Sequence, residues 1–399
     1  MGRALDFLKQ PSSGLVYQTL FFSEHVKFQY PPAGLLILDL LRWIGIRTPE
    51  ELNFINAGLL IATGLVFAVF SVRVLGSIRI FKVAVPIGPI AFILALRFYP
   101  SNLAFQIGQM QILLGFLFLL ACWAVLNDRR VLAGALIALA ATVKPQFLPL
   151  GVLALWQRNW RFAAGMIGVT AASLALSISL YGWLTHLDYL SVLSFLSKHG
   201  EYQHLNQSLG GFLVRELYQG PSLDRDPSGS IPQSAFPPYI AAVYIPTIIS
   251  SLLMLLTPFL VRSKGTDRIS RLLEFCTASL LFTMASPIAW VHHYNILLPV
   301  YIVALKGVFE RWQGARARIA LTLLGVSLLL TGYPWALASD PTIPSLDLLQ
   351  SHVFFGALML VGILLIEMRA PLLRVEPGKS SARVTSGVSG LSTGSMGHS

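Results

Sequence analysis

Charged residues are scarce in this chain: only 12% of its 399 residues are Asp, Glu, Lys or Arg. A soluble globular domain carries about 25% charged residues, so this scarcity excludes an ordinary soluble protein. Apolar residues take their place, because 55% of the residues are hydrophobic and the mean hydropathy is +0.67. The composition therefore predicts an integral membrane protein.

Cysteine is also scarce, and the two cysteines, Cys122 and Cys276, lie in apolar blocks without a spacing motif. We expect them to be small core residues, forming neither a disulfide framework nor a metal site. No other cofactor is indicated. The chain shows no internal repeat, which argues against an inverted-repeat transporter. Residues Met1–Tyr30 lack the apolar region of a signal peptide.

The apolar residues form blocks that are long enough to cross a hydrocarbon core, which takes about 20 residues. In lipid the backbone polar groups must be paired within the segment, so these blocks must be helices. We expect an all-α polytopic membrane protein with about ten membrane segments in residues 1–375. The tail 376–399, rich in Ser, Gly and Thr, is predicted to be disordered. Examples of the blocks are Ile55–Val72, Leu103–Leu126, Ala163–Trp183 and Tyr239–Val261.

The net charge of +11 does not indicate nucleic-acid binding, because the basic residues sit in short clusters between apolar blocks. That distribution is typical of cytoplasmic loops. It predicts that Asp267 and Gln313 face the cytoplasm, and that Gly200 and Ser345 face outside together with a long loop, 183–238. The clusters placed inside are Arg73/Arg79/Lys82, Arg129/Arg130, Arg158/Arg161, Arg262/Lys264/Arg268/Arg271, Lys306/Arg311/Arg316/Arg318 and the tail from Arg369 to Arg383.

For two segments the sequence allows two paths through the membrane. The stretch 131–157 has basic residues at both ends and a break at Lys144-Pro145. Since proline cannot donate to a helix ladder, we expect two half-helices, Val131–Val143 and Phe147–Gln157, that enter and return with Lys144 near the tip. The alternative is one kinked span. Pro31–Ile46 is either a short span or an element at the outer surface.

Polar residues gather on the outer side. The long loop is expected to have an ordered part, Asn206–Gly211, that lines a cavity, and a mobile part, Gly220–Ser234. Gln109 and Gln111 lie at the mouth of an apolar helix. Their amides can bind sugar hydroxyls as donor and acceptor, or they can join neighbouring helices.

Lys144 and a pair of histidines complete this face. An ammonium group at membrane depth costs roughly 2.5–3.5 kcal/mol, which favours a functional role such as binding a lipid phosphate; snorkelling to the interface is the alternative. His292 and His293 are adjacent, so on a helix their side chains point about 100° apart. We expect one at the site and the other in support, not both on one metal. Either can also be an ordinary interfacial residue.

These features, in this order, resemble glycosyltransferase family 87 of the GT-C superfamily. No single motif is strong, but five occur in sequence between about Tyr17 and Trp312. They are Phe28-Gln-Tyr-Pro-Pro32, Gly108-Gln-Met-Gln-Ile-Leu-Leu114, Ala133-Gly-Ala-Leu-Ile-Ala-Leu-Ala-Ala-Thr-Val-Lys-Pro145, Asn206-Gln-Ser-Leu-Gly-Gly211 and Ser286-Pro-Ile-Ala-Trp-Val-His-His293.

The resemblance implies a GT-C-like bundle that transfers a hexose, by family analogy mannose, from a polyprenyl phosphate to a lipid or glycan hydroxyl on the outer face. The configuration at the anomeric carbon would be inverted. Lys144 and His292 or His293 would stabilise the leaving phosphate. The protein would lie in a bacterial inner membrane. The substrate-binding residues would also include Tyr30, Gln109, Gln111, Asn206 and Gln207.

The family also implies a carboxylate base in the first outer loop, after a first membrane helix. Asp6 is the only acidic residue before Tyr17 and is the candidate, although its position matches poorly. We therefore expect the first helix and the base to be encoded upstream of Met1. The alternative readings are a catalytically inactive lipid-binding homologue and a lipid or solute transporter.

Overall fold

The computed structural model describes residues 1–10, 14–80, 83–218, 236–335 and 347–372. The predicted mobile part 220–234 and the predicted disordered tail 376–399 lie outside these ranges. The regular secondary structure of the described residues is helical apart from one hairpin of two-residue strands, β1 (Arg79–Ile80) and β2 (Val83–Ala84), which confirms the predicted all-α class.

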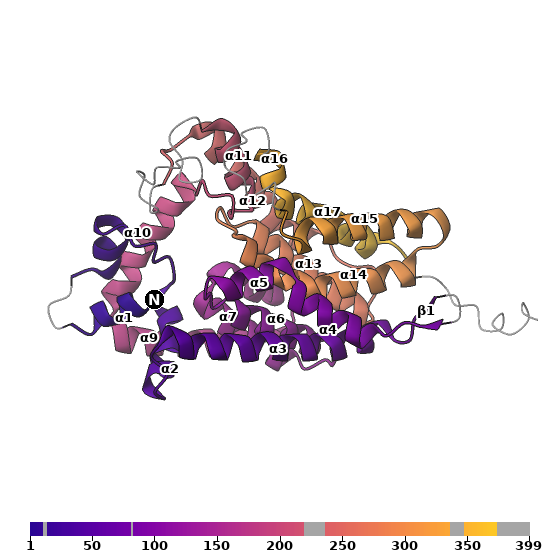
Figure 1. The fold of residues 1–399 in the computed structure, drawn as a ribbon, viewed down its shortest axis with the longest axis horizontal. Coiled ribbons are helices and arrows are strands. Elements are labelled where there is room, and N and C mark those ends of the chain that lie inside the picture. The colour runs from indigo at the N-terminus through magenta and orange to yellow at the C-terminus, as the bar shows by residue number, and fades with distance from the viewer. Residues whose placement is uncertain (11–13, 81–82, 219–235, 336–346, 373–399) are drawn as a thin grey trace, which may run out of the picture.

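Figure 1 shows how the helices of the described chain are arranged. The α-helices are α1 Gly2–Leu8, α2 Leu35–Trp43, α3 Pro49–Leu75, α4 Ile87–Arg97, α5 Tyr99–Gln106, α6 Gln111–Leu126, α7 Arg130–Val143, α8 Pro149–Trp156, α9 Trp160–Tyr181, α10 Trp183–His199, α11 Leu209–Leu217, α12 Ala241–Leu260, α13 Arg268–Met284, α14 Leu297–Arg311, α15 Gly314–Gly332, α16 Asp347–Gln350 and α17 His352–Arg369. A π-helix, η1 Gln18–Ser23, and three 3-10 helices, η2 Pro32–Gly34, η3 Pro145–Phe147 and η4 Val291–Ile296, complete them.

Five helices of the described chain, α3, α9, α12, α15 and α17, are long and apolar enough to cross a membrane. The pair α4–α5, bent by 45°, makes a sixth if it forms one broken span. Only 17% of the apolar window of α12 is buried, so most of its surface is left for lipid, as in a multi-pass membrane protein. The predicted number of about ten segments exceeds these and stays a prediction.

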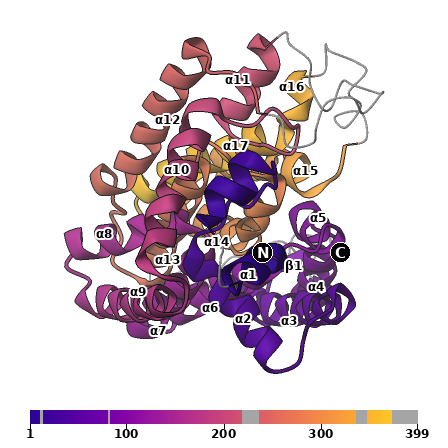
Figure 2. The ribbon, with the colours of Figure 1, turned by 90° about the vertical axis from the view of Figure 1, so that its left-hand side faces the viewer.

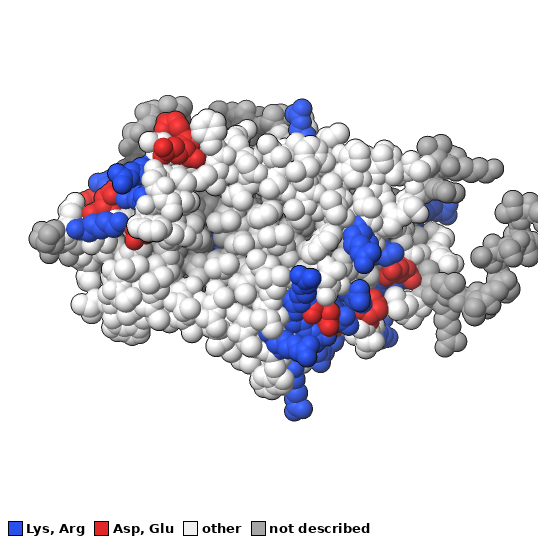
Figure 3. Space-filling view, turned by 90° about the horizontal axis from the view of Figure 1, so that it is seen from below, with Lys and Arg blue, Asp and Glu red and all other residues white. Residues whose placement is uncertain are grey.

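Charge is distributed along the long axis of the molecule as a membrane protein requires. On the face seen in Figure 3, charged side chains form one group at the left-hand end and a larger group from the lower middle toward the right, with mostly uncharged surface between them. The N-terminal segment and α10 lie at one end of this axis, and the β1 strand lies at the other (Figure 1). Viewed toward the first end, α10 crosses in front of the bundle (Figure 2).

The predicted hairpin at 131–157 is present. α7 ends at Val143, Lys144 has the extended backbone expected before proline (φ −129°, ψ 97°), and α8 returns. Arg130 and Arg158, at the two ends of the hairpin, line the same cavity. Helix α2, within the segment Pro31–Ile46, has nine residues, or about 14 Å, too short to span a bilayer.

Two predicted segments have more local structure than the sequence indicates. The block Leu103–Leu126 is interrupted between α5 and α6, where Gly108 has a φ of +62°, a conformation that favours glycine. The loop 183–238 contains two helices, α10 and α11.

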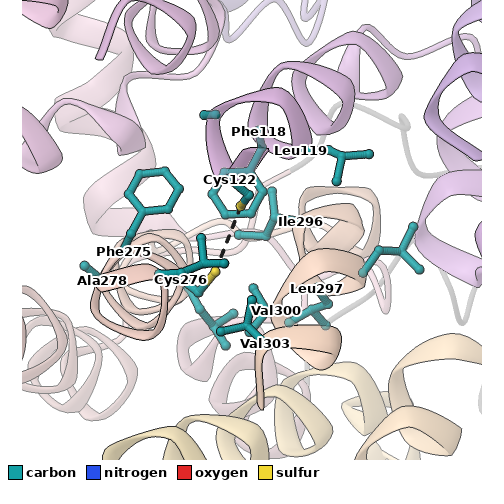
Figure 4. Close-up of a cluster of buried hydrophobic side chains, with 14 of the residues drawn as sticks. Phe118, Leu119, Cys122, Phe275, Cys276, Ala278, Ile296, Leu297, Val300 and Val303 are labelled. Atoms are coloured by element: carbon teal, nitrogen blue, oxygen red, sulfur yellow. Dashed lines mark hydrogen bonds between the residues drawn. The ribbon is translucent and has the colours of Figure 1, made fainter. Parts of the chain in front are cut away.

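As predicted, Cys122 and Cys276 are buried in the core, where their sulfur atoms lie 4.0 Å apart (Figure 4).

Candidate functional site

A cavity of about 390 Å³ lies between the N-terminal segment, the tip of the α7–α8 hairpin, α10 and η4. It brings together five residues that the sequence predicts for substrate binding: Tyr30, Gln109, Lys144, His292 and His293. Other lining residues include Lys27, Gln29, Pro145, Gln146, Pro149, Tyr189, Leu193, Leu196, Leu255, Phe282, Ala285, Ser286, Ile288 and Trp290.

Lys144 supplies an unpaired positive charge to this cavity. Its ammonium nitrogen lies 4.9 Å from the centre of the Tyr30 ring, an attractive cation–π contact. Among the described residues no carboxylate lies within ion-pair distance of it. The break at Pro145 explains its position, since it ends α7 and leaves Lys144 at the hairpin tip. A half-buried cation without an anion is suited to bind one from solution or lipid.

Tyr30 and Gln109 form a second part of the wall. The Tyr30 hydroxyl donates a hydrogen bond of 2.6 Å to the side-chain oxygen of Gln109, and the Tyr17 hydroxyl donates to the Tyr30 backbone oxygen at 2.6 Å. Tyr30 is thus held from both sides. The amide nitrogen of Gln109 has no hydrogen-bond partner among the described residues and is available to a hydroxyl group of a ligand.

Both histidines line the cavity, so the expectation that only one faces it is wrong. The segment that carries them is a 3-10 helix. The two imidazole rings are nearly perpendicular, with an interplanar angle of 86°, and their centroids lie 4.8 Å apart. Both side chains are buried, and neither Nδ1 atom has a hydrogen-bond partner within the described chain. No three His, Cys, Asp or Glu side chains of the described residues are grouped to hold a metal ion.

Burial, together with the nearby charge of Lys144, holds the pKa of His292 and of His293 well below the ordinary 6.5. Both rings lie on the connection between α13 and α14. Because their pKa is lowered, both are neutral at neutral pH. A neutral imidazole has one N–H donor and one acceptor nitrogen. The pair can therefore donate hydrogen bonds to an anion without adding charge.

Asn206 and Gln207 lie behind this wall and hold it in place. The backbones of Leu205 and Gln207 pair with Val291 and Ala289, at 2.8 and 2.7 Å. The Asn206 side chain accepts a bond from the backbone nitrogen of Ala289 at 3.1 Å. The Gln207 side-chain oxygen accepts two bonds from the start of α17, at 3.1 and 3.2 Å. Neither side chain lines the cavity.

Gln111 also lies outside the cavity lining. Its backbone oxygen accepts a hydrogen bond from the Asn295 amide at 2.5 Å, and the two side chains lie 3.5 Å apart. Of the two roles that the sequence leaves open for the glutamines, the structure gives Gln109 a place on the cavity and Gln111 a contact between α6 and η4.

Glu201 is a supporting residue that sequence reasoning did not single out. Its buried carboxylate pairs with Lys27 at 2.6 Å and accepts a 2.5 Å bond from the Trp290 indole. Lys27 and Trp290 both line the cavity. In sequence Glu201 is one of several charged residues in a polar stretch, and no spacing distinguishes it.

Asp6, the candidate base, forms a 2.5 Å ion pair with Arg42 and is exposed. It is not among the residues that line the cavity, and no Asp or Glu of the described chain is. The cavity wall is thus cationic and rich in hydrogen-bonding groups, which suits an anionic ligand with hydroxyl groups.

Comparison with known proteins gives a family match: the model of glycosyltransferase family 87 matches residues 28–287. A protein of Mycobacterium tuberculosis (strain CDC 1551 / Oshkosh) is 27% identical over 259 residues, 61% of this chain and 54% of that protein. A protein of Mycolicibacterium smegmatis (strain ATCC 700084 / mc(2)155) is 29% identical over 253 residues, 60% of this chain and 56% of that protein.

Both relatives are named polyprenol-phosphate-mannose-dependent alpha-(1-2)-phosphatidylinositol pentamannoside mannosyltransferase. The chain spans about half the length of the curated relatives it matches. No solved structure matches it significantly.

Proposed function

The chain belongs to glycosyltransferase family 87, and on that premise we propose that it transfers mannose from a polyprenyl-phosphate-linked donor to a lipid or glycan hydroxyl. The reaction takes place at the outer face of a bacterial inner membrane. The donor's polyprenyl chain lies in the membrane lipid, and its phosphate enters the cavity that Lys144, His292 and His293 line.

The unpaired Lys144 ammonium is the observation that carries this assignment. A polyprenyl phosphate places its charge where the hydrocarbon core meets the polar region, and Lys144 stands at the tip of an apolar hairpin. The apolar part of the lining, Leu193, Leu196, Leu255 and Phe282, suits the first part of the lipid chain. The amide of Gln109 suits a sugar hydroxyl.

In the proposed transfer the acceptor oxygen bonds to the anomeric carbon, the bond to the phosphate oxygen breaks, and the acceptor proton passes to a base. Charge grows on the departing phosphate. Lys144 stabilises this charge because it is held in place before the reaction, and the neutral histidines donate hydrogen bonds to it. Asn206, Gln207 and Glu201 position the wall and do not contact the substrate.

Donor binding by purified protein in nanodiscs tests the proposal. We expect Lys144→Ala to weaken binding of polyprenyl-phosphate-mannose by at least about tenfold, and Lys144→Arg to retain part of it. Lys306→Ala, at a residue of α14 that does not line the cavity, is the matched control. Equal loss of donor binding and of folded protein in Lys144→Ala would make Lys144 structural and remove the support for this site.

A turnover measurement separates a transferase from an inactive lipid-binding homologue and from a transporter. Release of polyprenyl phosphate with an acceptor present supports a transferase, while binding without turnover indicates an inactive lipid-binding homologue. Movement of the intact donor across the bilayer would indicate a transporter. Asp6→Asn with unchanged donor binding and abolished turnover would assign the base to Asp6.

A further inference from the structure

A second cavity, of about 540 Å³, lies at the opposite end of the α7–α8 hairpin from Lys144. It is formed where three helix connections meet: α6 to α7, α8 to α9, and α12 to α13. Four arginines, Arg130, Arg158, Arg262 and Arg271, line it together with Asp128 and Glu274. Nothing in the proposed transfer uses this cavity.

The cavity carries excess positive charge. Four arginines against two carboxylates leave a net charge of +2. Asp128 accepts a 2.8 Å bond from Arg130 and lies 3.8 Å from Arg271, so its charge is shared between two guanidinium groups. Glu274 accepts a 2.7 Å bond from the Ser263 backbone.

Two of the four arginines do not take part in these direct contacts. Among the described residues, the side chains of Arg158 and Arg262 make no direct hydrogen bond or ion pair, and Arg262 interacts with Glu274 only through the electrostatic effect of its charge. They come from different connections but line the same cavity. Guanidinium groups bind phosphate through paired N–H donors, so the unpaired set matches a phosphate group.

The rest of the lining is apolar. Leu150, Leu153, Ala154, Phe162 and Phe275 continue the wall toward the membrane helices. Trp156 and Trp160, on either side of Arg158 in the chain, are 67% and 63% exposed. Exposed tryptophans are typical of the level where headgroups meet acyl chains. The cavity thus joins a cationic rim to an apolar wall at the depth of a lipid headgroup.

We propose that this cavity binds an anionic phospholipid, with its phosphate on Arg158 and Arg262 and an acyl chain along Leu150, Leu153 and Phe162. Basic cavities between membrane helices are suited to anionic lipid headgroups. This proposal is independent of the transfer reaction, because it concerns the other end of the bundle.

The test measures the thermal stability of purified protein in neutral detergent while phosphatidylglycerol is added, with phosphatidylcholine as the zwitterionic comparison. We expect phosphatidylglycerol alone to raise the melting temperature. Arg158→Gln with Arg262→Gln should weaken its apparent affinity by about tenfold or more. Arg316→Gln with Arg318→Gln removes the same charge from exposed residues of α15 outside the cavity and should leave the effect intact.

Three outcomes would overturn the proposal. Equal losses of apparent affinity in both double variants would mean that lipid binding depends on the overall charge of the protein. An equal rise in melting temperature with phosphatidylcholine would mean that binding does not depend on the charge of the lipid. Inorganic phosphate or glycerol phosphate acting as well as phosphatidylglycerol would assign the cavity to a soluble anion. If the double variant does not fold, Arg158→Lys and Arg262→Lys replace it, since lysine keeps the charge but loses the paired donors. Donor binding at Lys144 is measured in parallel, so failure here leaves the proposed function untouched.

Discussion

The Lys144 ammonium lies 4.9 Å from the centre of the Tyr30 ring, and Tyr30 is itself bonded to Gln109 through its hydroxyl at 2.6 Å. Three elements remote in sequence therefore meet at one cation: the segment before α2, the α5–α6 connection and the tip of the α7–α8 hairpin. The aromatic ring leaves the ammonium free to meet an anion, whereas a carboxylate partner would neutralise it.

Replacing Tyr30 separates the two contacts that it makes. Tyr30→Phe keeps the ring beneath Lys144 and loses only the bond to Gln109, so we expect a donor affinity within about threefold of wild type. Tyr30→Leu also loses the cation–π contact, worth about 0.5–2 kcal/mol, and should weaken donor binding more. Isothermal titration with polyprenyl-phosphate-mannose measures the difference. Indistinguishable variants would show that the ring does not position Lys144.

Asn206 should behave as a structural residue. Its amide is buried and bonded to the segment that carries the histidines, so Asn206→Ala leaves buried groups unpaired, at a cost of about 1–3 kcal/mol. We expect a lower melting temperature with unchanged donor affinity in the protein that remains folded. Ser194→Ala, at an exposed site on α10, is the control. Loss of affinity without loss of stability would instead place Asn206 at the substrate.

Acidification should destabilise the protein through its buried histidines. Their pKa lies below 6.5 in the folded state, so the unfolded chain takes up protons that the folded chain does not. Stability from these groups is complete above about pH 6.5 and falls as the pH drops below it. Replacing both with Asn should reduce the loss of melting temperature between about pH 7 and pH 5.

His25 is the control for this measurement, because it is an exposed histidine and Asn tolerates its positive φ. The variant His25→Asn should keep the acid-induced loss. A double variant at His292 and His293 with the full wild-type loss would mean that other groups cause it.

The orientation in the membrane can be tested by cysteine labelling from outside the cell. Lys198→Cys, near the end of α10, should be labelled, and Gln313→Cys, before α15, should not. The reason is the basic clustering around Gln313, which favours the cytoplasmic side. The native cysteines are buried and should not react with the label. The opposite labelling pattern would reverse the orientation and with it the assignment of the cavity to the outer face.

The sequence alone determined the class of the protein and much of the cavity wall. Scarce charge and long apolar blocks require membrane helices, since only paired backbones are stable in lipid. The proline at 145 predicted a break, because it cannot donate to the helix ladder, but it left one kinked span as the alternative. The structure decided for the hairpin, with Lys144 at its tip. Tyr30, Gln109, His292 and His293 were also named from sequence, and all line the cavity.

Only the tertiary structure decided which of the similar polar residues face the cavity. Gln109 and Gln111 are two positions apart, yet one lines the cavity and the other contacts Asn295. Asn206 supports the wall, and Glu201 pairs with Lys27 across 174 positions of the chain. Such roles depend on long-range packing and hydrogen-bond partners, which residue type and local spacing do not specify.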